Sequence, residues 1–181
     1  MHPSTITFDQ VVAPVANQVR TFEDRFSAAL SSDVEKVQIM SRYLHENRGK
    51  HFRPVLALLS AQSVGECSAD VVEAAVGIEI LQTGTLIHDD VLDSADIRRG
   101  ADGLHVKWGN HAAILMGDFM LVKAMEILVG LRSLDVMEAA TRAIRRMIEG
   151  EILEDEKGSD GELSIYFTMI NKKTASLYAL A

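Results

Sequence analysis

The sequence is poor in cysteine, proline and basic residues, and each shortage excludes a class of protein. Its single cysteine, Cys67, cannot form an internal disulfide and fits a reducing cytoplasm, so we interpret it as a turn or core residue. With only 3 prolines and 48% hydrophobic residues, the 181-residue chain can bury a core, which excludes a disordered protein. Residues 1–8 lack the apolar stretch of a secretory signal.

The charge balance and the lack of long apolar runs exclude two kinds of partner. Asp and Glu number 26 against 18 Lys and Arg, a formal charge of −8, so a nucleic-acid partner is not expected. No run reaches the roughly 18 apolar residues of a membrane span. The longest candidate, 74–92, is interrupted by Glu79, Gln82, His88, Asp89 and Asp90. We therefore expect a soluble, cytoplasmic protein without a transmembrane segment.

Apolar residues recur at intervals of three and four along most of the chain, which is the pattern of amphipathic helices. The predicted helices, with their caps where one is evident, cover 8–30, 32–45 (capped at Ser32-Asp33), 55–64, the segment from Ser68 to the aspartates near 90, 112–131, 134–156 and 163–180. Gly49 is expected to end one helix, Pro54 fits the first turn of the next, and breaks are expected at 100–103 and 158–161. Short loops and the lack of a strand pattern predict an all-α chain, a single antiparallel helical bundle over residues 1–181.

Three carboxylates, Asp89, Asp90 and Asp93, lie on little more than one turn at the C-terminal end of the long helix. Acids there oppose the helix macrodipole and repel one another, so we expect a cation to neutralise them. Their apolar neighbours indicate that they line a cavity, although a solvated helix end is the plain alternative. Oxygen ligands of this kind, together with substrate phosphates, suit Mg²⁺. The adjacent His88 is interpreted as a hydrogen-bonded structural residue.

Cations follow the acids and recur at two other places. The adjacent Arg98 and Arg99 point in different directions, so they can bind two anions, or one of them is an ordinary surface charge. Lys50 and Arg53 flank a predicted helix start, where backbone N–H groups also favour phosphate. Lys172-Lys173-Thr174 offers similar cations beside a hydroxyl. Each signal is weak alone, whereas the acids and arginines together favour a metal–diphosphate site.

Five short motifs in this order resemble those of the trans-type polyprenyl diphosphate synthases, which extend allylic diphosphates with isopentenyl diphosphate. They are Gly49-Lys50-x-x-Arg53-Pro54, Asp89-Asp90-x-x-Asp93, Arg98-Arg99-Gly100, Gly117-Asp118-Phe119 and Lys173-Thr174-Ala175. The resemblance runs from Gly49 to Ala181. It implies an antiparallel helical bundle of the isoprenoid synthase type, a prenyltransferase activity that proceeds through an allylic carbocation, and a homodimer.

The resemblance also implies a role for each matching residue. The ligands of Mg²⁺ on the allylic diphosphate are Asp89, Asp90 and Asp93, and Arg98 contacts the same diphosphate. The residues near isopentenyl diphosphate are Lys50, Arg53, Gln82 and Arg99. The catalytic residues beside the allylic C–O bond are Lys173 and Thr174.

Two departures from the family pattern bear on activity. Arg48 stands where relatives often have a second glycine, which restricts the loop before Lys50. The second aspartate-rich motif of the family is expected beyond Thr174, and the sequence stops at Ala181 within a helical pattern. We therefore expect the 181 residues to form the N-terminal part of the fold, without its C-terminal helices, and to be inactive alone.

The resemblance also bears on product length, and it leaves other functions open. In relatives, an aromatic residue four or five positions before the first aspartate shortens the product, and here Gly84 and Thr85 are small, which favours a long product. One alternative is a non-catalytic or regulatory subunit of a heteromeric synthase. Another is a class I terpene cyclase, against which Lys50, Arg53 and the arginine pair argue because a cyclase binds one diphosphate.

Overall fold

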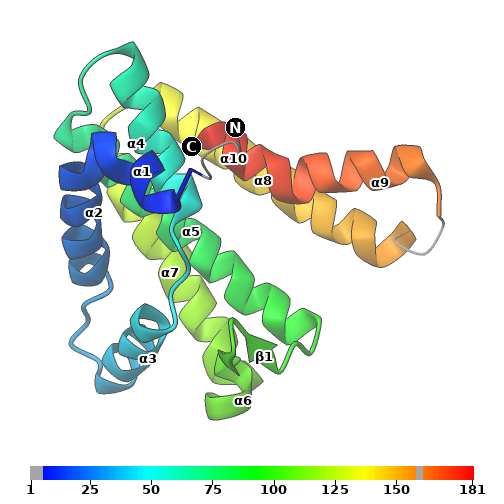
Figure 1. Ribbon diagram of the computed structural model, residues 1–181. Coiled ribbons are helices and arrows are strands. Elements are labelled where there is room, and N and C mark those ends of the chain that lie inside the picture. Colours follow the sequence, from blue (N-terminus) through cyan, green and yellow to red (C-terminus); the bar gives the residue numbers. More distant parts are fainter. Residues whose placement is uncertain (1–5, 158–160) are drawn as a thin grey trace. The chain divides into compact units, whose positions relative to one another are not determined.

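Helices make up nearly all of the structure, a computed structural model that describes residues 6–157 and 161–181 (Figure 1). The all-α prediction is confirmed. The chain divides into two compact units, Met1–Ile127 and Leu128–Ala181, which are described one at a time. That the whole chain forms a single domain stays a prediction. None of the described helices is long and apolar enough to cross a membrane.

The first unit is built around one long helix. Its elements are α1 (Phe8–Val12), the 3₁₀ turn η1 (Ala13–Val15), α2 (Ala16–Ala29), α3 (Glu35–Glu46), α4 (Phe52–Val64), α5 (Ala69–Leu92), β1 (Ile97–Arg98), β2 (Ala101–Asp102), α6 (Leu104–Trp108) and α7 (Asn110–Gly130), which continues into the second unit. Helix α5 is buried around most of its circumference, and it packs on α2 and α4. Phe22, Leu58, Ile80 and Leu81 are fully buried, and each such side chain stabilises the fold by about 1.5–3 kcal/mol.

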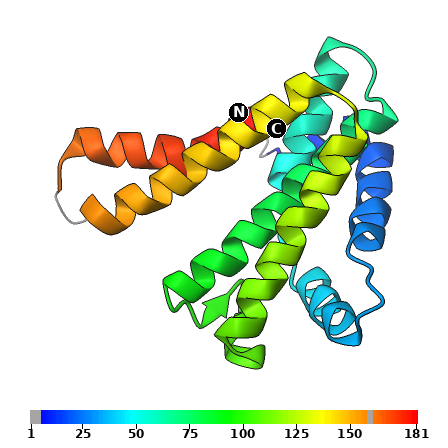
Figure 2. The ribbon, with the colours of Figure 1, turned by 180° about the vertical axis from the view of Figure 1, so that it is seen from behind.

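Helices α5 and α7 lie side by side in both ribbon views (Figure 1 and Figure 2). Gly84 permits this close packing, because a Cβ there would lie 3.0 Å from Met120 Cβ and 3.1 Å from the Gly117 carbonyl oxygen. A Cβ at Gly117 would in turn lie 2.2 Å from Nε2 of His88. His88 lies 3.0 Å from the Ile114 carbonyl oxygen, which matches the structural role predicted for it.

Several helix boundaries differ from the predictions for local reasons. Pro14 lacks an N–H, and the predicted helix 8–30 is divided there into α1, η1 and α2. The predicted cap at Ser32-Asp33 is wrong, because Ser32 Oγ accepts from the Val34 N–H and α3 starts only at Glu35. Helix α3 ends at Glu46, before Gly49. The cap at Ser68 is confirmed by its bond from the Val71 N–H.

The second unit contains a helical hairpin. Its elements are α8 (Leu134–Lys157), α9 (Leu163–Ile170), the π-helical turn η2 (Asn171–Ala175) and α10 (Ser176–Leu180). The predicted helix 163–180 is thus interrupted by a π turn, in which the Ser176 N–H bonds to the Asn171 carbonyl. Of the predicted break at 158–161, residues 158–160 lie outside the described residues, and Gly161 has a φ of +68°.

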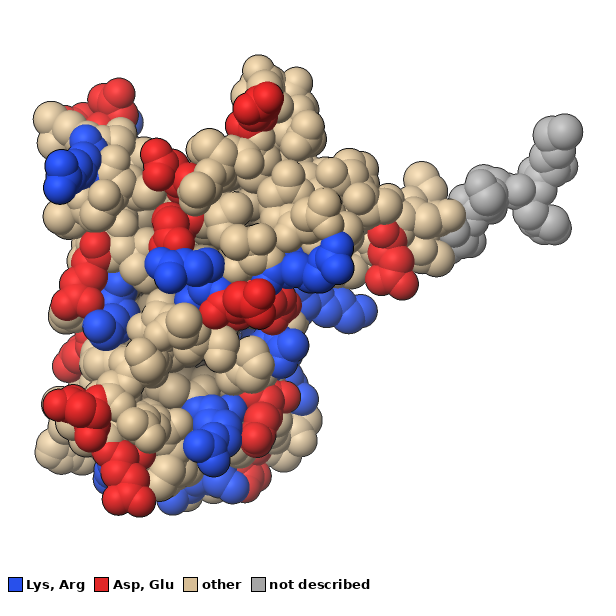
Figure 3. All heavy atoms as spheres, turned by 90° about the vertical axis from the view of Figure 1, so that its left-hand side faces the viewer, with Lys and Arg blue, Asp and Glu red and all other residues tan. Residues whose placement is uncertain are grey.

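Acidic and basic side chains are mixed on the face of the molecule drawn in Figure 3. Red and blue side chains are interspersed there among uncharged residues, and several blue ones lie next to one another across the middle of the view, beside red ones. This distribution agrees with the excess of acidic residues in the sequence.

Replacing Gly150 by alanine should destabilise the second unit. A Cβ at Gly150 would lie 2.4 Å from the backbone nitrogen of Lys173, and backbone cannot swing aside as a side chain does. We expect Gly150→Ala to cost about 1–3 kcal/mol of unfolding free energy in urea titrations followed by circular dichroism. Gly130→Ala is the matched control, because no atom lies within 4 Å of its added methyl group. Equal stability of both variants would refute the close approach.

Candidate diphosphate and metal site

A short β-hairpin after α5 presents the arginine pair. Its strands pair Ile97 with Asp102 and Arg98 with Ala101. The two residues between them, Arg99 and Gly100, have φ values of 54° and 81°, the left-handed conformation of a tight primed turn. Glycine adopts this conformation at no cost, whereas arginine does so at a cost of about 1–2 kcal/mol. Arg99 is therefore held in a conformation that its side chain disfavours.

The guanidinium of Arg99 lies against Gly49 in the loop that precedes α4. A Cβ at Gly49 would lie 2.7 Å from Arg99 Cζ, so a residue with a side chain would displace the guanidinium. Lys50 follows Gly49 directly and is exposed. The structure thus brings together the Gly49-Lys50 loop and Arg99, which are far apart in the sequence.

The three aspartates differ in burial. Asp90 is buried, accepts a hydrogen bond from Arg98 Nε at 2.8 Å, and also contacts Arg98 Nη2. It lines a cavity of about 60 Å³ beneath the hairpin, so the predicted cavity lining is confirmed for Asp90. Asp89 is half-buried, whereas Asp93 is exposed, so the predicted cavity lining is wrong for Asp93. The reason is that Asp93 is the C-cap, where α5 has already reached the surface.

The acids act on Arg98 as a group. The hydrogen bond to Asp90 raises the pKa of the Arg98 guanidinium above its ordinary value, and the charges of Asp90, Asp89 and Asp93 act in the same direction, against the opposing effect of burial. Arg98 therefore supplies the cation that the crowded helix end requires. It neutralises Asp90 most directly, because Asp90 Oδ1 accepts from Arg98 Nε and is also in contact with Nη2.

The carboxylates at this helix end are of the kind that holds a magnesium ion whose coordination a ligand completes. Within the described ranges, no group of three or more His, Cys, Asp or Glu side chains forms a ready metal cage. Mg²⁺ is usually held by one or two carboxylates, substrate phosphates and water rather than by protein alone. Asp89 and Asp93 are one turn apart on the same face of α5, so their oxygens would serve as that carboxylate pair.

The other residues predicted to contact isopentenyl diphosphate lie on two helices. Arg53 is the second residue of α4 and is half-buried. Gln82 is buried on α5, where its carbonyl accepts from the Thr85 hydroxyl at 2.9 Å. Grouping Gln82 with the cations stays a prediction.

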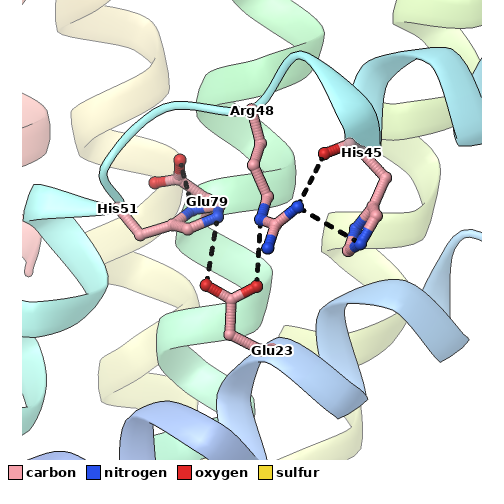
Figure 4. A network of polar contacts seen from close by, with 5 residues as sticks. All are labelled: Glu23, His45, Arg48, His51 and Glu79. Atoms are coloured by element: carbon pink, nitrogen blue, oxygen red, sulfur yellow. Dashed lines mark hydrogen bonds and ion pairs between the residues drawn. The ribbon is translucent and has the colours of Figure 1, made fainter.

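Sequence reasoning missed a polar network behind Lys50, formed by Glu23, His45, Arg48, His51 and Glu79 (Figure 4). Its one signal was Glu79, an acid within an apolar run.

Lys173 and Thr174 lie in the π turn of the second unit. Thr174 is exposed, and Lys173 Nζ is 2.7 Å from Glu151 Oε2 and also contacts Glu154. Burial lowers the pKa of Lys173, but hydrogen bonds to both glutamates and their charges outweigh burial and raise it well above its ordinary value. Lys173 is therefore a cation at neutral pH and is unsuited to act as a base.

Comparison with known proteins gives one consistent family. A family model described as Polyprenyl synthetase matches residues 34–181. The chain is 34% identical over 180 residues to the all-trans-nonaprenyl-diphosphate synthase (geranyl-diphosphate specific) of Rhodobacter capsulatus, with 97% of this chain and 55% of the relative covered. It is 38% identical over 155 residues to the octaprenyl diphosphate synthase of Escherichia coli, with 84% and 48% covered. The chain spans about half the length of these curated relatives.

The solved structures agree with the sequence matches. The crystal structure of a polyprenyl synthase from Caulobacter crescentus, complexed with calcium and isoprenyl diphosphate, superposes with a TM-score of 0.92 at 29% identity. The match covers 96% of this chain and 54% of that one. The predicted helical fold of the isoprenoid synthase type is therefore confirmed.

Replacing each arginine of the hairpin by asparagine tests whether that arginine is retained for function or for the stability of the fold. Arg99→Asn should raise the unfolding free energy by about 1 kcal/mol in urea, because asparagine tolerates the left-handed conformation. Arg98→Asn is the control. It should lower stability, since it removes the partner of the buried Asp90. A similar loss of stability in both variants would show that Arg99 is retained for the fold.

Proposed function

Because the chain belongs to the polyprenyl synthetase family, we propose that it contains the two diphosphate sites of a prenyltransferase that lengthens an allylic diphosphate with isopentenyl diphosphate. The observation that supports this most directly is the hairpin after α5. In the hairpin, Arg98 pairs with Asp90 and Arg99 lies against Gly49. The two adjacent arginines therefore face the acidic end of α5 and the loop that contains Lys50. Two such places suit two diphosphates. A terpene cyclase requires only one.

The proposed chemistry needs no protein nucleophile. Asp89 and Asp93, with Asp90 beside them, would hold Mg²⁺, which neutralises the allylic diphosphate and makes it a better leaving group. Arg98 orients that diphosphate, and Lys50, Arg53 and Arg99 orient isopentenyl diphosphate. Loss of diphosphate gives an allylic cation, which the isopentenyl double bond attacks, and a proton then leaves to the released diphosphate. The roles that the resemblance implies for Lys173 and Thr174, beside the allylic C–O bond, stay predictions.

The two sites should respond separately to mutation. Asp89→Ala should abolish Mg²⁺-dependent binding of a non-hydrolysable allylic diphosphate analogue in calorimetry, because it removes half of the carboxylate pair. Lys50→Ala should weaken the binding of isopentenyl diphosphate by about tenfold and leave the affinity for the analogue within about twofold of the original. Asp96→Ala is the control, since this nearby carboxylate is exposed and lies outside the helix.

Three outcomes would contradict this assignment or narrow it. Unchanged analogue affinity in Asp89→Ala would refute the metal role. Equal losses for both ligands in Lys50→Ala would refute the division into two sites. Turnover by the chain would contradict both the inactivity expected of these 181 residues and a non-catalytic subunit. The implied homodimer and the cytoplasmic location stay predictions.

We further propose that Thr85, and not Gly84, controls product length. Gly84 faces the backbone of α7, so a large side chain there would separate two packed helices. Thr85 is half-buried on the turn before Asp89, and its hydroxyl bonds only locally, to the Gln82 carbonyl. The small side chain at Thr85 favours a long product.

Replacing Thr85 by phenylalanine should therefore shorten the products. The measurement is the chain length of radiolabelled prenyl diphosphates, made by a form of the protein that turns over substrate. Thr85→Ala, which adds no bulk, is the matched control and should leave the longest product unchanged. Products of unaltered length in Thr85→Phe would place the end of the hydrocarbon tunnel elsewhere.

A further inference from the structure

Two acids from different helices hold the residues on either side of Gly49-Lys50 (Figure 4). Glu79 of α5 places Oε1 3.0 Å from His51 Nδ1. Glu23 of α2 places Oε1 3.7 Å from His51 Nε2 and Oε2 3.1 Å from Arg48 Nε. Arg48 also donates from Nη1 to the His45 carbonyl at 3.0 Å. The loop is therefore fastened immediately before Gly49 and immediately after Lys50.

Burying the side chains of His51 and Glu79 costs free energy, which a purely structural contact would not require. The side chains of His51 and Glu79 are 6% and 7% exposed, and a buried acid destabilises a core unless it is paired. The His51 ring also packs edge-on against Phe22 and Phe26, with centroids 5.1 and 5.4 Å away. An apolar pair of similar volume would pack as stably at such a place. The polar pair therefore points to a task beyond core stability.

The backbone of His51 explains what the pair restrains. His51 is the N-cap of α4 with a φ of 50°, a left-handed conformation that histidine disfavours. Its carbonyl accepts the Val55 N–H at 3.0 Å, which starts the helix. The ring must be anchored for the backbone to stay in this conformation. The direction of Lys50, and the surface of Gly49 on which Arg99 lies, depend on the same backbone.

We infer that Glu79 and Glu23 are positioning residues for the isopentenyl diphosphate site, acting through His51 and Arg48 on the loop that contains Lys50. This inference rests on the proposed function. Lys50 is exposed and has a flexible stem, so its ammonium reaches a diphosphate reproducibly only from a fixed backbone. In this role neither glutamate needs to touch substrate. Each fixes the residues that present the cations before the ligand arrives.

Variants of Glu79 test the inference, with Glu73 as the matched control. Glu73 lies on the same helix and pairs with Arg25 of α2 at 2.5 Å, so it joins the same two helices without involving the loop. Glu79→Leu should weaken the binding of isopentenyl diphosphate by about tenfold in calorimetry. Glu79→Gln keeps an acceptor for His51, so its affinity should stay within about threefold of the original, and Glu73→Gln should not change the affinity. The Mg²⁺-dependent allylic analogue should bind equally to all of them.

A second readout does not need the ligand. In amide hydrogen exchange, residues 48–53 should exchange faster in Glu79→Leu than in Glu73→Gln, with the core of α5 unchanged. If wild-type protein fails to bind isopentenyl diphosphate, the proposed function fails, and exchange alone then decides the inference. Where Glu79→Leu does not fold, Glu23→Gln perturbs the same loop from a partly exposed position.

Two results would overturn the inference. One is unchanged exchange of residues 48–53 in every folded variant of Glu79 and Glu23. The other is an equal loss of affinity for both diphosphates in Glu79→Leu, which would show that Glu79 supports the fold as a whole rather than this loop.

Discussion

Negative charge gathered at the C-terminal end of α5 is the constraint to which the rest of the first unit responds. The helix dipole adds to that charge, and burial of Asp90 prevents water from screening it fully. A positively charged side chain from a later segment must therefore pack against this helix end. The hairpin Ile97–Asp102 supplies it by folding Arg98 back onto Asp90. Tyr43 of α3 secures the hairpin by donating its hydroxyl to the Asp102 carbonyl at 2.8 Å.

The same hairpin links the acidic end of α5 to the loop before α4. Arg98 and Arg99 are adjacent in a tight turn, so fixing one on Asp90 also directs the other, which lies against Gly49. Both Arg99 and His51 adopt left-handed backbone conformations that their side chains disfavour. Such residues persist where the surroundings determine them strongly, and they concentrate at functional sites. Unfavourable backbone at Arg99, and at His51 two residues after Gly49, supports the proposal that the geometry around this contact is maintained for binding.

How much the sequence could predict depends on the range of each interaction. Helix α5 and its Ser68 cap follow from local periodicity and capping, and both were predicted correctly. The aspartates and arginines were recognised by residue type and spacing. The different environments of the three aspartates could not be predicted. The pairing of Asp90 with Arg98 and the exposure of Asp93 depend on where the chain turns after α5. The contact between Gly49 and Arg99 joins distant segments, so no local pattern reports it.

The π turn in the second unit shows a further limit of periodicity. The apolar spacing of residues 163–180 fits a continuous α-helix, yet one wider turn at Asn171–Ala175 changes which side chains face α8. Gly150 lets that turn approach closely, and Lys173 then reaches Glu151 and Glu154. Because the pKa of Lys173 is raised in the folded protein, its ion pairs contribute stability that is fully present below the unfolded pKa and is lost as pH rises through the folded pKa. Its charge is thus constant around neutrality, so Lys173 contributes no change of stability with pH in that range.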